Sequence, residues 1–244
     1  MTILLLSTQI LNSLQSWRFE KGFCVPFPEE TVLNPTILRQ TEADKEEKAP
    51  DGMIITIAPM NSEIVKPRMV NISGKLIGLT APEVHRLCRE IGKRAAFQEH
   101  KIIVDSLTSE VKGIEVAEIN ETAITQAIET VSKGTFSGST ILMSPILKAQ
   151  LIKNRTLVPS WLVPKRENAH SFAGTISGCN AFWTTEIDNR VCLVTARSAV
   201  GIKRNTPQIS LHPTGPNPTS IRFEEEMVCW AIDTGAVFVL KQKA

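Results

Sequence analysis

Hydrophobic residues at the start of the chain recur at the spacing of an α-helix. The positions that share this stripe are Ile3, Leu6, Ile10, Leu14 and Trp17. The pattern predicts a short amphipathic helix. Pro26, Pro28 and Pro35 follow and exclude a continuous helix or a central strand. Residues 42–48 then form a charged run, typical of a solvated segment. Because such a segment cannot build its own core, residues 1–50 are expected either to fold back on their own subunit or to pack on a neighbour.

From Met53 the pattern changes to extended, β-prone sequence. The apolar run Ile54–Ile57 is followed by a break at Pro59 and by a second apolar run over residues 64–72. Proline cannot donate to a strand ladder, so Pro59 and Pro67 predict an exposed two-stranded ribbon and not a central sheet. An isolated hairpin is marginally stable in water. The ribbon therefore needs another surface to lie on.

One long helix is the clearest local prediction, from Thr80 to about Ser106. Thr80-Ala-Pro-Glu83 is a capping box with proline in the first turn. The apolar face that follows consists of Val84, Leu87, Cys88, Ile91 and Ala95. The other face carries His85, Arg86, Arg89, Glu90, Lys93 and Arg94. This second face is expected either to be solvated or to form a binding patch.

The remaining chain alternates helix and strand and then becomes extended. Asn120 is a good N-cap for a second helix, which Gly134 is expected to end. Ser139 to Ser144 is predicted as a buried strand, and Pro145 can open another short helix. Further extended segments are predicted over residues 175–183, 191–194, 209–211, 220–232 and 236–240. This succession indicates an α+β fold.

Composition limits the function classes that are open. The chain has 244 residues, 42% hydrophobic and 21% charged, which suffices for one large domain or two intergrown ones. The formal charge of +2 is too balanced for a surface that binds polyanions throughout. Five scattered cysteines without a C-x-x-C pair favour neither a zinc site nor a disulfide scaffold. The first residues lack the basic region of a signal peptide, so a cytosolic origin is expected.

The sequence carries no motif of a nucleophile elbow, a phosphate loop or a dinucleotide-binding turn. His170 near Cys179 would allow a Cys–His pair, although a turn between two strands explains the nearby glycines with fewer assumptions. The run Glu224-Glu-Glu226 would allow a divalent cation, but alternation along a strand favours solvated or boundary-spanning side chains. Residues that would permit an isopeptide cross-link in a suitable geometry are Asn61, Lys66, Asn71 and Lys75. We expect no enzyme activity, no cofactor and no metal.

The order of these parts resembles the Hong Kong 97 bacteriophage capsid family, which also includes the encapsulin shells. In that family an N-terminal arm, an extended E-loop, a long spine helix and an axial domain precede the strands of a peripheral domain. Met53 to Ile72 is similar to the E-loop, and Thr80 to Ser106 is similar to the spine helix. Ala95-Ala-Phe-Gln-Glu-His100 resembles the alanine-rich end of that helix, and residues 127–145 resemble the axial helix and strand.

The resemblance implies an α+β, Hong Kong 97-like capsid fold with an N-terminal arm of residues 1–50 and an E-loop ribbon of 51–79. It implies a peripheral domain of 80–112 and 206–244 and an axial domain of 113–205. The implied function is a structural protein that self-assembles into an icosahedral viral capsid around a genome. The alternative is an encapsulin-type shell around cargo protein, and a third possibility is an enzyme of unrelated α+β fold.

The implied partners are further copies of the chain in hexamers and pentamers, enclosed nucleic acid or cargo protein, and an optional scaffolding or decoration protein. No membrane partner is expected, and no fused scaffolding segment. The protein would belong to a virion assembled in host cytoplasm or, as an encapsulin, to the cytoplasm. The residues expected at contacts between subunits are Ile3, Leu6, Ile10, Leu14, Ile57, Glu63, Lys66, Arg68, Arg89, Lys93, Glu224 and Glu226.

Overall fold

The computed structural model describes residues 3–19, 24–26, 36–40, 45–48, 54–57, 60–111, 113–132, 138–163, 169–196, 199–213 and 218–243. Between residues 24 and 64, and at 213 and 218, the description covers the backbone alone. The helices are α1 (Ile3–Trp17), α2 (Ala81–Glu110), α3 (Glu121–Ser132) and α4 (Pro145–Lys153), with 3-10 turns η2 (Ser160–Leu162) and η3 (Thr234–Ala236).

A five-stranded sheet is built around one long strand, β15 (Pro218–Ala231). Its other members are β1 (Cys24–Pro26), β6 (Arg68–Lys75), β13 (Val200–Arg204) and β14 (Gln208–Pro213). Three of these strands, β6, β13 and β14, run antiparallel to β15, and β1 lies parallel to β13. Alternate residues of β15 are buried, so the sheet has one face toward the core.

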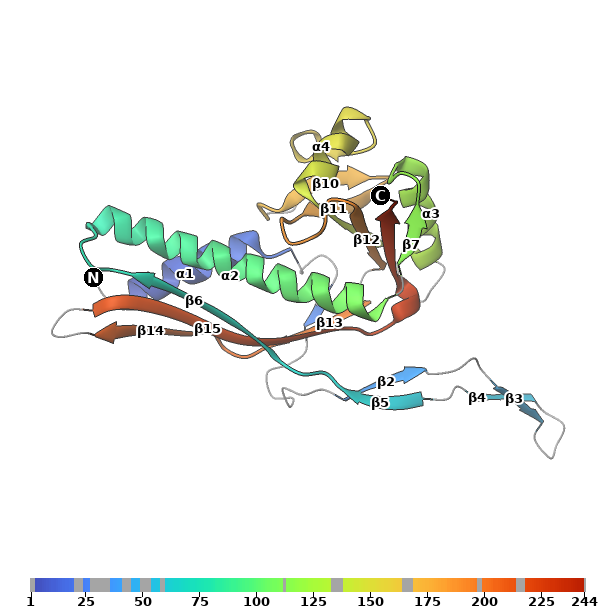
Figure 1. The fold of residues 1–244 in the computed structure, drawn as a ribbon, viewed down its shortest axis with the longest axis horizontal. Coiled ribbons are helices and arrows are strands. Elements are labelled where there is room, and N and C mark those ends of the chain that lie inside the picture. Colours follow the sequence, from blue (N-terminus) through green and yellow to red (C-terminus); the bar gives the residue numbers. More distant parts are fainter. Residues whose placement is uncertain are drawn as a thin grey trace.

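A mixed seven-stranded sheet forms the second body, in the order β7-β16-β12-β8-β11-β10-β9. Its strands are β7 (Ile114–Val116), β8 (Ser139–Met143), β9 (Val158–Pro159), β10 (Phe172–Ile176), β11 (Cys179–Trp183), β12 (Val191–Ala196) and β16 (Val237–Gln242). The central strand β8 is buried along its whole length, as the sequence predicts. Helix α3 contacts β12, β16 and β8, and α4 stands above this body in Figure 1.

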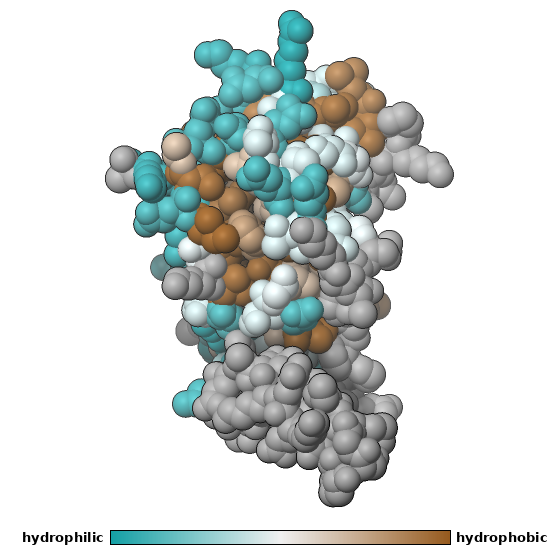
Figure 2. Space-filling model, turned by 90° about the vertical axis from the view of Figure 1, so that its right-hand side faces the viewer, coloured by the Kyte–Doolittle hydropathy of each residue, from teal (hydrophilic) through white to brown (hydrophobic). Residues whose placement is uncertain are grey.

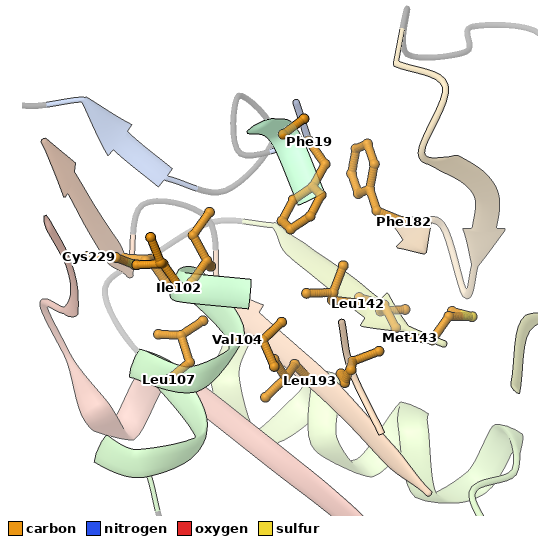
Figure 3. Packing of buried hydrophobic residues seen from close by; sticks show 14 of the residues in the cluster. Phe19, Ile102, Val104, Leu107, Leu142, Met143, Phe182, Leu193 and Cys229 are labelled. Atoms are coloured by element: carbon orange, nitrogen blue, oxygen red, sulfur yellow. The ribbon is translucent and has the colours of Figure 1, made fainter. Parts of the chain in front are cut away.

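Helix α2 connects the two sheets. It begins after Thr80, whose backbone N–H donates to Glu83 Oε2 at 2.7 Å, and this confirms the predicted capping box. It ends at Glu110, four residues beyond the predicted end, because Ile103, Val104 and Leu107 continue its buried face. Figure 3 shows how its C-terminal half lies between the sheets: Val104 lies toward Leu142 and Leu193, and Ile102 toward Cys229.

Helix α1 lies parallel to α2. Three contacts along the pair fix its register. Gln9 Oε1 is hydrogen-bonded to His85 Nδ1, and Ser13 Oγ donates to the Arg89 carbonyl at 2.7 Å. Further along, the Arg18 guanidinium donates to the Glu99 carboxylate. The helices approach closely at Gly92, where an added Cβ would lie 2.3 Å from the carbonyl oxygen of Ile10. Glycine is required at position 92 because a side chain would collide with α1. Its backbone angles are ones that other residues also adopt.

The ribbon differs from its prediction in strand pairing. Two further strands, β2 (Thr36–Gln40) and β3 (Lys45–Lys48), come from the segment expected to be an arm. β2 pairs with β5 (Met60–Ile64), and β3 pairs with β4 (Ile54–Ile57). β6, expected in the ribbon, instead joins β15 and buries Val70. The ribbon thus spans residues 36–64 and projects from the body in Figure 1.

Strand pairing also corrects the expected domain boundaries. β13 lies within the range 113–205 expected for the axial domain, yet it pairs with β15 in the five-stranded sheet. β16 lies within 206–244, expected for the peripheral domain, yet it pairs with β12 and β7 in the other sheet. The chain crosses between the sheets before Val200 and again at η3, positions that hydrophobic spacing does not mark.

Candidate assembly interface

The ribbon is built from strands that pair in twos. Its four strands pair mainly with one another, β2 with β5 and β3 with β4, and two-stranded ribbons have no second layer to bury their side chains. Ile57 and Glu63 lie on β4 and β5, but their side chains are outside the description. At the base of the ribbon Lys66 and Arg68 are exposed, and Arg68 lies 3.5 Å from Asp105 of α2.

The N-terminal helix folds back on its own subunit. Leu6, Ile10 and Leu14 are buried against α2, so these three predicted contact residues belong to the core of the chain instead. The physical reason is the close approach at Gly92, which brings the apolar stripe into the groove of α2. Ile3 remains 44% exposed, and its neighbour Leu4 is 74% exposed. Only this first turn of the helix presents apolar side chains outward.

A groove of about 630 Å³ runs between α1 and α2. Its basic or titratable lining residues are His85, Arg86, Arg89, Lys93 and His170. The acidic residue of the described lining is Glu90, so positive charge predominates. Lys93 Nζ lies 5.1 Å from the ring centroid of Trp17, a cation–π distance, and Trp17 in turn packs on Phe97. The face predicted as solvated or binding is therefore partly covered by α1 and partly open.

The acidic run of β15 is divided between the two faces of the sheet. Glu224 Oε1 lies 2.9 Å from Arg222 Nη2, and Glu226 accepts from Asn205 Nδ2 at 3.1 Å. Both are half-buried, whereas Glu225 points into the core. The three carboxylates therefore do not converge. Within the described ranges no group of three or more histidine, cysteine or acidic side chains is placed to hold a metal ion.

A buried ionic cluster joins α1, α2 and the five-stranded sheet. Arg18 donates to both carboxylate oxygens of Glu99, from Nε at 2.9 Å and from Nη2 at 2.7 Å. The same Nη2 lies 3.0 Å from Glu225, and Arg204 Nη2 donates to Glu99 at 3.0 Å. Sequence reasoning missed this cluster. Its signal was present, because Glu225 occupies an inward position in the alternating row from Ile221 to Cys229.

The two buried carboxyl groups differ in acidity. Burial opposes ionisation of Glu99, but the charges of Arg204 and Arg18 outweigh it and hold the pKa at about 2. Burial and the neighbouring Glu99 raise the pKa of Glu225 to about 8, although Arg18 acts in the opposite direction. The cluster is thus two guanidinium groups around one carboxylate, with the second carboxyl group holding a proton at neutral pH.

The groups considered for catalysis do not form a reactive pair. Burial lowers the pKa of His100 to about 3, and its ring lies 4.0 Å from that of Phe19, so it is a neutral core residue. His170 packs on Trp17. Cys179 donates to the Ser177 carbonyl, and burial raises the pKa of its thiol, which disfavours the thiolate nucleophile. Ser177 and Gly178 have positive φ, which confirms a turn between two strands.

Apolar side chains are exposed on the seven-stranded body. They lie at α4, η2 and the two edge strands: Ile114, Ile146, Val158, Trp161 and Leu162. Figure 2, which looks at the side of the molecule with α3 and β7, shows hydrophobic atoms at the surface among hydrophilic ones. No helix in the part of the chain that the structure describes is both long and apolar enough to cross a bilayer. These exposed residues are therefore candidates for contact with protein.

Comparison with solved structures identifies the fold. No protein-family model and no curated protein matches the sequence. The virus-like particle from Pyrococcus furiosus matches with a TM-score of 0.63 and 12% identity, over 97% of this chain and 98% of that chain. The capsid of the cyanophage P-SCSP1u matches with a TM-score of 0.57 and 9% identity, over 93% of this chain and 89% of that chain. The holo-encapsulin complex from Synechococcus elongatus PCC 7942 matches with a TM-score of 0.57 and 12% identity, over 90% of this chain and 84% of that chain.

The chain therefore has the Hong Kong 97 capsid fold, an α+β fold, as the resemblance implied. The match extends over nearly the whole length of both chains, so the architecture as a whole is shared. The long helix α2 is the element expected as the spine helix, and β4 and β5 of the ribbon fall within the range expected for the E-loop.

Proposed function

We propose that this protein is a structural shell protein, many copies of which assemble into a closed icosahedral particle. The observation that carries the proposal is the ribbon of residues 36–64. It extends away from the body, and among the described residues its strands form two separate two-stranded sheets (Figure 1). A two-stranded ribbon is marginal in water. A neighbouring subunit would supply the missing surface, and the shared fold of capsids and encapsulin shells supports this arrangement.

The chemistry of the chain supports a structural role over a catalytic one. Burial lowers the pKa of His100 and raises the pKa of the Cys179 thiol, and Arg18, Glu99 and Glu225 form the buried ionic cluster. The particle would contain hexamers and pentamers of this chain, with Lys66, Arg68, Glu224 and Glu226 at or near the contacts. Any scaffolding or decoration protein would be a separate polypeptide chain.

A viral major capsid protein is the favoured form of this function. Its particle would enclose a genome and belong to a virion assembled in host cytoplasm. The cyanophage capsid that shares the fold supports this form, and the encapsulin that matches with the same TM-score supports the alternative. The content of purified particles tests it: nucleic acid that resists nuclease until the shell is opened is the expected result, and particles that contain protein alone would contradict it.

An encapsulin-type shell is the second candidate, and the groove between α1 and α2 favours it. The groove is open and has a volume of about 630 Å³, and Arg86, Arg89 and Lys93 make it suitable for an acidic segment of a cargo protein. Reversing charge with Arg86→Glu/Arg89→Glu should leave shells intact and empty them of cargo. If this variant retains its contents, the groove is not the cargo site.

Shortening the ribbon tests the shell function itself. Replacing residues 43–58 by a short Gly/Ser turn removes β3 and β4 and leaves β2 and β5 in place. The expected result is a folded subunit with unchanged melting temperature that no longer sediments as closed particles. The unchanged melting temperature is the internal control, since the ribbon tip contributes little to the core of its own chain. Full-size particles from the shortened chain would overturn the assembly role of the ribbon.

A further inference from the structure

The groove between α1 and α2 carries positive charge that the chain does not compensate. Arg86 and Arg89 are exposed, and within the described part of the chain neither guanidinium has an ion-pair or hydrogen-bond partner. Glu90, the acidic residue of the described lining, lies 3.0 Å from the guanidinium of Arg94, which is outside the lining. The charge of Glu90 is thus already balanced, and the groove can accept an anionic ligand.

The cations of the groove form a row along one side of α2. Arg86, Arg89 and Lys93 follow one another at intervals of three and four residues, so they share a face of the helix. At a rise of about 1.5 Å per residue, the row is about 10 Å long. It can therefore contact successive negative charges of one extended chain. Across the groove, α1 contributes the exposed amide of Asn12.

Aromatic side chains follow the cations at one end of the groove. Lys93 Nζ lies 5.1 Å from the centroid of the half-buried Trp17 ring, and the ring of the exposed His170 lies 5.0 Å from that of Trp17. Trp17 also meets Trp183 edge-on at 6.1 Å. Lys148 of α4 lies 5.3 Å from the Trp183 ring. Basic and aromatic side chains therefore alternate from α2 to α4.

This alternation suits single-stranded nucleic acid. Cations bind the phosphates of such a strand, and tryptophan or histidine rings offer faces on which its unpaired bases stack. An acidic peptide would account for the cations but not for the aromatic residues beside them. The volume of about 630 Å³ is that of a pocket for a drug-sized ligand. The groove thus has room for a few nucleotides of one strand and not for a duplex.

We propose that the groove between α1 and α2 binds a short stretch of single-stranded nucleic acid, with phosphates on Arg86, Arg89 and Lys93 and a base against His170. Such a site would hold enclosed nucleic acid, so the proposal rests on the viral form of the shell function. The acidic cargo segment of the encapsulin form is the competing occupant of the same groove.

The phosphate contacts are tested with a fluorescently labelled ten-nucleotide oligothymidylate and the full-length protein, by anisotropy at several salt concentrations. Arg86→Gln/Arg89→Gln should weaken binding at least tenfold at low salt. It should also lower the slope of log K against log salt by about 1.4, because each phosphate contact on a single strand contributes about 0.7. The control Lys101→Gln/Lys241→Gln removes the same charge from exposed positions outside the groove and should leave the slope unchanged.

The aromatic contact has a different signature. His170→Ala should weaken binding at least about fivefold and leave the salt slope unchanged, since lost base stacking removes no phosphate contact. A duplex of the same length, and polyglutamate with ten carboxylates, should each bind the unchanged protein at least tenfold more weakly than the single strand. Polyglutamate that binds as tightly as the oligonucleotide would assign the groove to an acidic peptide and overturn the proposal. An unchanged slope in the folded double arginine variant would overturn it as well.

Particles provide the second measurement. Arg86→Gln/Arg89→Gln should form shells in normal yield that contain at least threefold less nuclease-protected nucleic acid. Circular dichroism and thermal melting establish that each variant is folded. Unchanged contents in these shells overturn the role of the groove and leave the shell function intact. If the unchanged protein itself gives no particles, the shell function fails, and the role of the groove inside a particle fails with it. The behaviour of the unchanged protein thus distinguishes the two failures.

Discussion

Arg18, the residue after α1, forms a two-pronged ion pair with Glu99 in the middle of α2. Nε and Nη2 of the guanidinium lie 2.9 and 2.7 Å from the two carboxylate oxygens, and the Glu99 side chain has no solvent exposure. Planar guanidinium suits this two-point geometry better than an ammonium group does. The pair fixes the end of α1 to α2 at the level where α2 meets β15.

Removing Arg18 should therefore destabilise the subunit strongly. Arg18→Ala leaves Glu99 with one remaining guanidinium, that of Arg204, and should cost about 3–5 kcal/mol of unfolding free energy. Arg18→Lys keeps a charge and should cost less. Urea denaturation measures both. Arg94→Ala, which breaks the exposed pair with Glu90, is the matched control and should cost about 0.5 kcal/mol or less. Equal effects at Arg18 and Arg94 would contradict a structural role of the cluster.

The dependence of the unfolding free energy on pH should reveal that Glu225 is protonated in the folded subunit at neutral pH. Its pKa is about 8 in the folded chain against 4.5 ordinarily, so the folded state binds the proton more tightly. The stabilisation of the folded state by this proton is complete below pH 4.5 and is lost as the pH rises to 8. Glu225→Gln should flatten the decline across this window, since a neutral amide replaces a neutral carboxyl group. Denaturation at pH 5 and pH 8 checks it, and an unchanged decline in the variant would contradict the assignment.

Close helix packing should make Gly92 intolerant of even a methyl group. Gly→Ala within a helix ordinarily gains about 1 kcal/mol. Here the new Cβ would lie 2.3 Å from the Ile10 carbonyl oxygen, so α1 must shift, and overpacking of this kind costs about 1–3 kcal/mol. Hydrogen exchange should show faster exchange of the α1 amides in Gly92→Ala. Gln98→Ala, on the exposed side of α2, should leave α1 protected, and slower exchange in Gly92→Ala would contradict the packing.

Two leucines of α1 should respond in opposite ways to the same substitution. Leu14 is fully buried, whereas Leu4 is 74% exposed. Leu14→Ala should cost about 2–5 kcal/mol because it opens a cavity beneath α1. Leu4→Ala should stay within about 0.5 kcal/mol in the isolated subunit. Thermal unfolding of the two variants compares them, and a large loss at Leu4 would indicate that the first turn is packed as well.

Local patterns predicted the helices well, because their determinants lie close together in the sequence. The apolar stripe from Leu6 to Leu14 predicted α1, and the capping box at Thr80 predicted the start of α2. At the start of α3, Asn120 Oδ1 accepts a hydrogen bond from the Ala123 N–H, as the predicted N-cap requires. The buried strand β8 followed from its unbroken apolar run. The predicted end of α3 at Gly134 lies outside the described residues.

Strand partners were not predictable in the same way, because pairing depends on residues far apart in the chain. Nothing in the charged run Lys45–Lys48 indicates that it pairs with Ile54–Ile57, or that β6 leaves the ribbon for β15. The buried cluster was hidden for a related reason. Glu225 looks like one of three surface acids until its inward neighbours on β15 are considered, and its partner Arg18 is 207 residues away.

Electron microscopy of the purified full-length protein tests the central claim most directly. A shell protein with this fold should give closed particles of uniform diameter with icosahedral symmetry, and averaged images should show density for the ribbon lying across a neighbouring subunit. The same preparation, opened and assayed for nucleic acid and for a second protein, separates the capsid from the encapsulin form. A preparation that stays monomeric at all concentrations and ionic strengths, with a folded subunit, would contradict the account.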